Sequence, residues 1–200
     1  MKAAIENAAE AHRLRTRLDP DDGTKIIPGR LGHIYEHDEG VLGVMVMPNP
    51  PRIMAGMGKA HATNTGIREH GEFSVNIPSV EMVAATDWCG LNSASRGAEK
   101  AAVFDIVRGT LPHAPMIADC PLSLECHVVQ VVDLGTHELF VADIVTTWAD
   151  EGCLDKKGRP DITKVRPFTL TMPDNRYWAV GEQVGDAWSI GKTFVPRSLR

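Results

Sequence analysis

A short polar stretch, GMGKAHATNTGIREHG over residues 56–71, holds the side chains best suited to chemistry in this chain. Lys59 supplies a positive charge, and His61 and Thr63 supply side-chain donors. Glycines at positions 56 and 58 allow a ligand to approach the backbone closely. This combination of donors, charge and accessible backbone predicts a site for a phosphate group.

The run ATNTGIREHG predicts a short helix, which Thr63 or Asn64 would cap and Gly71 would end. The amides of residues 64–66 would then lie at the helix start, where free N–H groups and the helix dipole favour an anion. The alternative interpretation is that Thr63 only caps a helix and Lys59 is solvated. The candidate binding residues of this stretch are Gly58, Lys59, Ala60, His61, Thr63 and Asn64.

Two further stretches could contribute to the same site. The loop GLNSASRGAEK, residues 90–100, offers Ser93, Arg96 and Lys100 to a phosphate or a polyhydroxyl chain, although by itself it could equally be a solvated polar loop. The stretch NRYWAVGE places two flat apolar side chains, Tyr177 and Trp178, beside a glycine. Both aromatic residues could also be ordinary core residues.

Other chemistries lack their motifs in this sequence. It contains no GxSxG, HExxH, Walker A or complete GxGxxG pattern, because His61 stands where the third glycine would be. The four cysteines form no CxxC pair, so reduced and mostly buried thiols are expected. Cys120, Cys126 and His127 have a spacing that fits no common metal site. A metal enzyme is therefore the weakest of the functional hypotheses.

Composition restricts the class of protein. The 200 residues suggest one domain with a real core, and 43% hydrophobic with 24% charged residues is typical of a soluble globular protein. The net charge of -5 argues against general affinity for nucleic acid. No apolar run approaches the roughly 20 residues needed to cross a bilayer. The N-terminus lacks the apolar centre of a signal peptide, which predicts a cytoplasmic protein.

The pattern of elements favours an antiparallel β-barrel with a few helices. The N-terminal residues 2–18 predict a helix, and the HDEG sequence at residues 37–40 predicts a hairpin turn. Further on, residues 50–58 and 72–77 predict strands, and residues 78–90 predict a helix that Ser79 begins and Gly90 ends. The clearest signal is a hairpin of LSLECHVVQVVDL and HELFVADIVTTWAD, followed by short strands at PFTLTMP and RYWAVGE and an edge segment at WSIGKTF. We expect an atypical N-terminal helix and linker over residues 1–24 and one domain over residues 25–200.

The stretch KAHATNTGIREHGEFSVNIPSVEMVAATDWCG resembles the flavoredoxin-like branch of the flavin reductase family. The likeness continues through CPLSLECHVVQVVDLGTHELFVADIV, GRPDITKVRPFTLTMPDNRYWAVGE and GDAWSIGK, so it covers roughly residues 50–192. The resemblance implies a mainly β fold with short helices, the FMN-binding split β-barrel with Greek-key antiparallel strands. It also implies a homodimer with FMN at the interface.

The resemblance assigns roles to the candidate residues. Gly58, Lys59, Ala60, His61, Thr63 and Asn64 would hold the FMN phosphate and ribityl end, and Ser93 with Arg96 or Lys100 would lie near the flavin from the next loop. Trp178 would lie near the isoalloxazine ring, from the same chain or the partner. No catalytic side chain is expected, because the flavin carries the redox chemistry.

The implied activity is that of an FMN-dependent oxidoreductase that takes electrons from NAD(P)H or a protein donor. The sequence departs from the family at its N-terminal side, where IIPGRLGHIYEHDEGVLGVMVMPNPP replaces a strand that usually carries NxMTxxW and faces the flavin ring. A lost wall there would weaken ring binding. The alternative function is therefore a non-catalytic dimeric split-barrel protein with a degraded flavin site.

Overall fold

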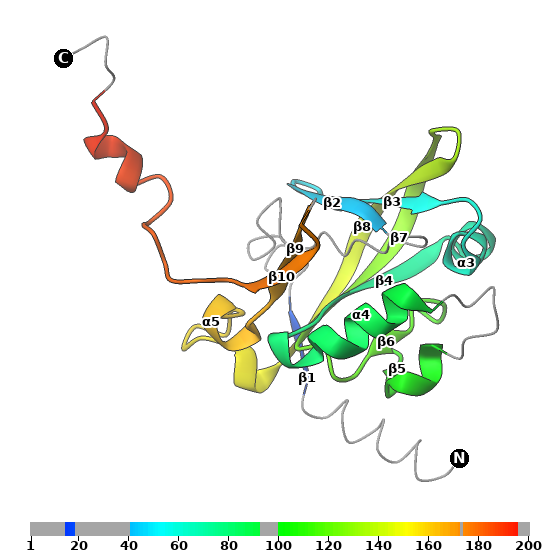
Figure 1. The fold of residues 1–200 in the computed structure, drawn as a ribbon, viewed down its shortest axis with the longest axis horizontal. Helices are drawn as coiled ribbons and strands as arrows, with labels where there is room; N and C mark the ends of the chain where they lie inside the picture. Colours follow the sequence, from blue (N-terminus) through cyan, green and yellow to red (C-terminus); the bar gives the residue numbers. More distant parts are fainter. Residues whose placement is uncertain (1–14, 19–40, 93–99, 173, 196–200) are drawn as a thin grey trace.

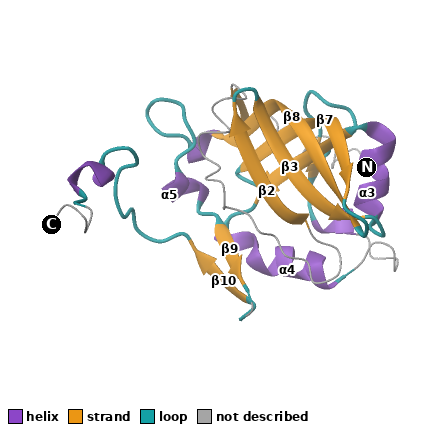
Figure 2. Ribbon diagram, turned by 90° about the horizontal axis from the view of Figure 1, so that it is seen from above, coloured by secondary structure: helices purple, strands orange, loops and turns teal. Residues whose placement is uncertain are grey.

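The computed structural model describes residues 15–18, 41–92, 100–172 and 174–195. Its centre is a curled antiparallel sheet, shown in Figure 1 and from above in Figure 2. The strands follow in space the order β2 (Val41–Pro48), β3 (Pro51–Gly58), β8 (His137–Asp150), β7 (Leu122–Asp133) and β4 (Glu72–Ile77). A further strand, β1 (Arg15–Leu18), pairs with the far end of β8. This mainly β, half-barrel architecture confirms the predicted fold class.

The long β7–β8 hairpin forms the backbone of the sheet, as its Val- and Thr-rich sequence predicts. Gly135 lies in its turn with φ 83°, a left-handed conformation that favours glycine. Alternate residues of β8 point into the barrel, among them the fully buried Phe140 and Ala142. They pack with Ile53 of β3 and with Cys126 of β7, and burial raises the pKa of the Cys126 thiol. The core therefore lies on the concave side of this sheet.

Short helices and small hairpins surround the sheet. One helix, α3 (Ala62–His70), joins β3 to β4, and Figure 1 places it on the other side of the central sheet from the β9–β10 hairpin. The remaining elements are α4 (Val83–Leu91), α5 (Ile162–Val165), the 3-10 turns η1 (Val80–Met82), η3 (Lys100–Val103), η4 (Glu151–Cys153) and η5 (Ile190–Thr193), and the strand pairs β5 (Ile106–Val107) with β6 (Met116–Ile117) and β9 (Phe168–Thr171) with β10 (Arg176–Ala179).

Outward-facing side chains of β4 hold the segment 113–117 against the sheet. Glu72, Ser74 and Asn76 share one face of the strand because successive side chains alternate. Their backbone partners are the amide of His113 at 2.9 Å, the carbonyl of Pro115 at 2.5 Å and the amide of Ile117 at 3.0 Å. These side chains therefore satisfy backbone groups of residues 113–117 that a neighbouring strand would otherwise pair with.

Glu125 of β7 extends this attachment to the preceding turn. Its fully buried carboxylate accepts hydrogen bonds from the amides of Thr110 and Leu111 at 2.9 and 2.7 Å. It also accepts a hydrogen bond from the indole Nε1 of Trp148 at 2.7 Å. A Cβ on Gly109 would lie only 2.5 Å from Glu125 Oε2, so the turn needs glycine there to approach the carboxylate. One charged side chain thus joins two strands and a loop.

The structure corrects three expectations about elements. The predicted helix over residues 2–18 is wrong for its last four residues, Arg15–Leu18, which form β1 by pairing with β8. Residues 1–14 lie outside the described residues, as does the expected hairpin turn at 37–40. The helix expected to end at Gly90 continues to Leu91. The WSIGKTF segment joins no sheet and instead contains η5.

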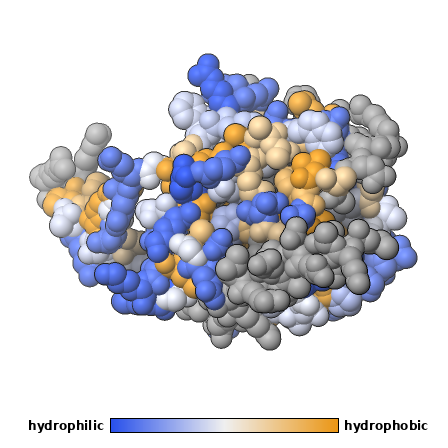
Figure 3. Space-filling model, turned by 90° about the horizontal axis from the view of Figure 1, so that it is seen from below, coloured by the Kyte–Doolittle hydropathy of each residue, from blue (hydrophilic) through white to orange (hydrophobic). Residues whose placement is uncertain are grey.

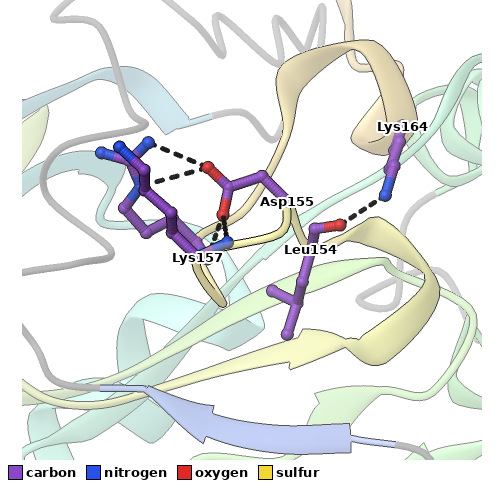
Figure 4. Close-up of polar contacts among 5 residues, drawn as sticks. Leu154, Asp155, Lys157 and Lys164 are labelled. Atoms are coloured by element: carbon purple, nitrogen blue, oxygen red, sulfur yellow. Dashed lines mark hydrogen bonds and ion pairs between the residues drawn. The ribbon is translucent and has the colours of Figure 1, made fainter.

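Asp155 organises the loop between β8 and β9. Its Oδ1 accepts hydrogen bonds from the amides of Lys157 and Arg159 at 2.7 and 2.9 Å, and its Oδ2 lies 2.9 Å from Nη2 of Arg159 (Figure 4). The same view shows Nζ of Lys164 donating to the carbonyl of Leu154. Hydrogen bonds from Arg159, first of all from its amide, lower the pKa of Asp155 to about 2.

This arrangement predicts a pH-dependent contribution to stability. Because the pKa of Asp155 is depressed in the folded state, its stabilising effect is complete above the ordinary value of 3.8 and is lost as the pH falls toward about 2. Asp155→Asn should therefore lower the melting temperature at neutral pH, and the difference from wild type should shrink as the pH falls. Asp119→Asn, at an exposed position, serves as the control and should show no such convergence. A constant difference at every pH would contradict the prediction.

Candidate functional site

The polar turn after β3 is fixed between that strand and the β7–β8 hairpin. The amide of Lys59 donates to the carbonyl of Thr136 at 3.0 Å, and the amide of His61 donates to the carbonyl of Gly58 at 3.2 Å. In the ladder, Gly58 pairs with His137. The hairpin therefore determines where the turn lies and how α3 leaves it.

The position of the His61 ring leaves no room for a side chain at Gly58. A Cβ on this glycine would lie 2.4 Å from both Cδ2 and Nε2 of His61 and 3.7 Å from Nε2 of His137. The second imidazole is held in turn, because its Nδ1 lies 2.9 Å from Oγ1 of Thr136. Two histidine rings of the chain itself thus border the backbone at this glycine, and the approach of a ligand there stays a prediction.

The first turn of α3 presents free backbone donors. The helix begins at Ala62 with His61 as its N-cap, and the N-cap side chain makes no hydrogen bond to the helix. The first intrahelical bond is the amide of Thr65 to the carbonyl of His61 at 3.4 Å. Within the described part of the chain, the amides of residues 62–64 have no acceptor. The expected capping by Thr63 or Asn64 is wrong, and the free amides begin two residues earlier than residues 64–66.

Asn64 adds an unpartnered donor to this helix start. Its side chain is 96% buried, and among the described residues its Nδ2 has no hydrogen-bond partner. A buried donor without an acceptor costs about 1–3 kcal/mol, so most native structures avoid one. A ligand oxygen would satisfy it. Asn64 and the free amides together have the chemistry of an anion site on a helix of nine residues.

The nearby cations are shared with acids of β7 and β8. The ammonium of Lys59 lies 2.7 Å from Oδ1 of Asp133, and this hydrogen bond is the main reason that the pKa of Asp133 is lowered. Arg68 of α3 lies 3.5 Å from the buried carboxylate of Glu138. Since an ammonium carries three N–H donors, Lys59 can keep Asp133 and still donate to an anion. Its position is compatible with binding a phosphate, and that role stays a prediction.

The second predicted cluster falls mostly outside the described residues. Ser93 and Arg96 are not described, whereas Lys100 is partly buried at the start of η3 and has an interaction partner. Asn92 ends α4, with its Nδ2 donating to the carbonyl of Trp88 at 2.8 Å. The structure therefore does not show whether this loop meets the turn at Lys59, and the roles of these residues remain predictions.

Trp178 lies on β10, far from α3 within one chain. Its indole Nε1 donates to Oγ1 of Thr171 at 2.9 Å, and half of its surface is exposed. The neighbouring Tyr177 donates its hydroxyl to Asp87 of α4 at 2.8 Å, which holds the hairpin against that helix. Figures 1 and 2 both place β9–β10 and α3 on opposite sides of the central sheet. The structure therefore does not bring Trp178 to the turn at Lys59 in a single chain.

Comparison with known proteins identifies the family. The profile of the flavin reductase like domain matches residues 43–177, which is more than half of the chain. The chain belongs to this flavin reductase like family. The match begins in β2 and ends in β10, so it includes the turn after β3 and the whole of β3, β4, β7 and β8.

Solved structures support this membership of the flavin reductase like family. A flavoredoxin from Methanosarcina acetivorans is 43% identical, with a TM-score of 0.73 over 76% of this chain and 81% of that one. The flavoredoxin of Desulfovibrio vulgaris (Miyazaki F) is 27% identical, with a TM-score of 0.69 over 83% of this chain and 97% of that one.

One curated relative is named for its activity. The reductase component of a 4-nitrophenol 4-monooxygenase/4-nitrocatechol 2-monooxygenase from Rhodococcus opacus is 29% identical over 52% of this chain and 52% of that protein. The chain spans 64% and 52% of the length of the first two curated relatives that it matches. What those whole proteins do therefore transfers only as a proposal.

Sequence reasoning missed the contribution of the β7–β8 hairpin to this site. Asp133 and Thr136 bind Lys59, and His137 lies beside Gly58, although the sequence analysis gave them no role. The only signal was the polar DLGTHE at the hairpin turn. Of the described residues, no three His, Cys, Asp or Glu side chains are grouped so as to hold a metal ion. No described helix has the length and hydropathy to span a membrane.

Proposed function

We propose that this chain is an FMN-dependent oxidoreductase of the flavoredoxin and flavin reductase kind, which receives electrons from NAD(P)H or from a protein donor. The observation that carries the proposal is the uncapped first turn of α3 beside the unpartnered amide of Asn64. These donors suit the terminal phosphate of FMN, because a helix N-terminus favours a dianion. A cytoplasmic location stays a prediction of the sequence.

The residues of the turn would bind and orient the flavin. The amides of residues 62–64 and Asn64 Nδ2 would hold phosphate oxygens, and Lys59 would offset part of their charge. The imidazoles of His61 and His137 would border the chain that follows the phosphate. The electron transfer itself would be the chemistry of bound FMN, and the protein would supply position and electrostatics.

The first experiment compares flavins that differ only in phosphate. Purified protein is titrated with FMN and with riboflavin, and binding is followed by flavin fluorescence. We expect FMN to bind roughly 100-fold more tightly or better, because each charge-assisted hydrogen bond contributes about 1.5–3 kcal/mol. Equal affinity for the two would contradict the phosphate anchor. Protein that binds neither flavin would instead support the alternative, a binding protein with a degraded flavin site.

Binding and turnover are separated by a second measurement. The FMN-loaded protein is mixed under anaerobic conditions with NADH, with NADPH or with a chemically reduced electron-transfer protein. The loss of flavin absorbance then reports reduction of the bound FMN. Reduction by any of these donors supports an oxidoreductase. A flavin that binds tightly and is reduced by none of them would favour a non-catalytic role.

Lys59→Ala tests the charge at the turn. Since Lys59 supplies at most one charge-assisted contact to the phosphate, its loss should weaken FMN binding by about 1.5–3 kcal/mol, or roughly 10- to 150-fold. Riboflavin affinity should hardly change. Lys156→Ala, which removes an exposed lysine from the loop after η4, is the matched control. Unchanged FMN affinity in Lys59→Ala would show that the ammonium serves only Asp133.

A further inference from the structure

An ion pair between Arg68 of α3 and Glu138 of β8 lies beside the candidate anion site. Nη1 of Arg68 lies 3.5 Å from Oε1 of Glu138, and the two side chains are 56% and 7% exposed. Hydrophilic residues are spread over much of the face seen in Figure 3, where water solvates their charges. Glu138 lacks that solvation, and a buried carboxylate needs a partner of opposite charge. Within the described residues, Arg68 is the one cation paired with it.

The register of β8 places Glu138 between the two strands that lead to the site. In the ladder, Glu138 pairs with Met57 of β3 on one side and with Asp133 of β7 on the other. Met57 lies two residues before Lys59, and Asp133 is the acid that binds the ammonium of Lys59. Because side chains alternate along a strand, Glu138 faces the same side of β8 as the buried Phe140. The carboxylate therefore lies at the end of the core nearest the polar turn.

Contacts other than this ion pair hold α3 in place. Before the helix, the backbone of Lys59 is bonded to the β7–β8 hairpin, and after it the amide of Val128 donates to the carbonyl of Gly71 at 2.8 Å. Between these two points, Ile67 is buried in the core. The pair with Glu138 therefore fixes mainly the guanidinium of Arg68, a long side chain that otherwise has many rotamers.

Arg68 lies one turn after Asn64 on the same side of α3. Residues four apart are neighbours on a helix, and helical side chains lean toward the N-terminus. The guanidinium is therefore directed toward the turn that holds Asn64 and the free amides. Its charge also reaches Asp133: the hydrogen bond from Lys59 is the main cause of the lowered pKa of Asp133, and the charge of Arg68 is a further cause. Two cations thus lie near one another, each beside its own acid.

We propose that Arg68 is a second cation of the anion site and that Glu138 is its positioning residue. The inference rests on the proposed function, in which the anion is the phosphate of FMN. A guanidinium carries five N–H donors, so the contact with Glu138 leaves others for phosphate oxygens. The buried carboxylate holds the long side chain before the ligand arrives, which reduces the entropy lost on binding.

Removal of Glu138 distinguishes positioning from simple repulsion by the direction of the effect. If its carboxylate only repelled the phosphate, Glu138→Met would strengthen FMN binding. If it positions Arg68, the same change releases the guanidinium and should weaken FMN binding by roughly 3- to 10-fold. Glu138→Gln keeps an acceptor oxygen and should lose less. Riboflavin, which has no phosphate, should bind all of these variants like wild type.

Arg68→Gln completes a double-mutant cycle with Glu138→Met. The single Arg68→Gln variant should bind FMN roughly 10- to 150-fold more weakly, with little change for riboflavin. In this variant Glu138 has no cation to hold, so adding Glu138→Met should raise FMN affinity, which is the opposite of its effect in wild type. Arg52→Gln is the matched control, because it breaks the 2.6 Å ion pair with Asp143 on the outer face of β3 and β8 and should change neither affinity.

Fluorescence titration measures each affinity, and circular dichroism checks the fold of each variant. Glu138→Met leaves only the exposed Arg68 without its partner, so it gives a result even if the unpaired carboxylate of Arg68→Gln prevents folding. A Glu138→Met variant that binds FMN as tightly as wild type, or more tightly, would overturn the positioning role. Unchanged FMN affinity in Arg68→Gln would overturn the role of Arg68. Equal affinity of wild type for FMN and riboflavin would instead overturn the phosphate anchor of the proposed function, and this inference with it.

Discussion

Replacing Glu125 with alanine is expected to lower the free energy of unfolding by about 3–5 kcal/mol, which is a large part of the stability of a typical domain. The carboxylate is fully buried and is the acceptor for the amides of Thr110 and Leu111 and for the indole of Trp148. Its removal takes an acceptor from three donors and leaves a cavity. Denaturant unfolding followed by tryptophan fluorescence measures the change.

Two variants separate the hydrogen bonds of Glu125 from other effects. Glu125→Gln keeps the size of the side chain and one acceptor oxygen, so its loss of stability should lie between those of wild type and Glu125→Ala. Glu69→Ala removes an exposed acid of α3 and should change stability by no more than about 0.5 kcal/mol. If Glu125→Ala behaved like Glu69→Ala, the carboxylate would not be what attaches the 109–111 turn to the sheet.

The second large effect is expected for Asn64→Asp and concerns ligand affinity. A carboxylate in place of the amide would repel a bound phosphate and would remove the donor at Nδ2. The loss of a charge-assisted hydrogen bond alone costs about 1.5–3 kcal/mol, so FMN affinity should fall by roughly 10- to 150-fold or more. Fluorescence titration with FMN and with riboflavin gives both affinities, and riboflavin binding should change little.

The same variant is also measured without ligand. A carboxylate at this position is 96% buried, and burial of a charge without a dedicated partner is costly, so it should lower the melting temperature of the ligand-free protein. The affinities for FMN and riboflavin are therefore measured at a temperature where the variant is folded. Thr65→Asp places the same charge on an exposed neighbouring residue and should reduce FMN affinity less. Equal losses in the two variants would indicate a general effect of charge and not a contact at Asn64.

The fold follows from local patterns to a large extent. The β7–β8 hairpin, the strands at residues 51–58 and 72–77 and the end of α3 at Gly71 all lie where alternation and turn residues predict them. The N-terminal prediction failed at Arg15–Leu18 because helix propensity is weak compared with pairing along β8. The start of α3 was misplaced because the sequence offered Thr63 and Asn64 as caps, whereas His61 occupies that position over Gly58.

The sequence by itself determined the fold class, the long β7–β8 hairpin and the polar turn at residues 58–64, because alternation, glycine and donor chemistry are local properties of the chain. Only the tertiary structure decided that Asn64 is buried without a partner, that Lys59 is shared with Asp133, and that Trp178 lies far from α3. These facts depend on residues far apart in the sequence, which meet only because β8 pairs with β3 on one side and β7 on the other.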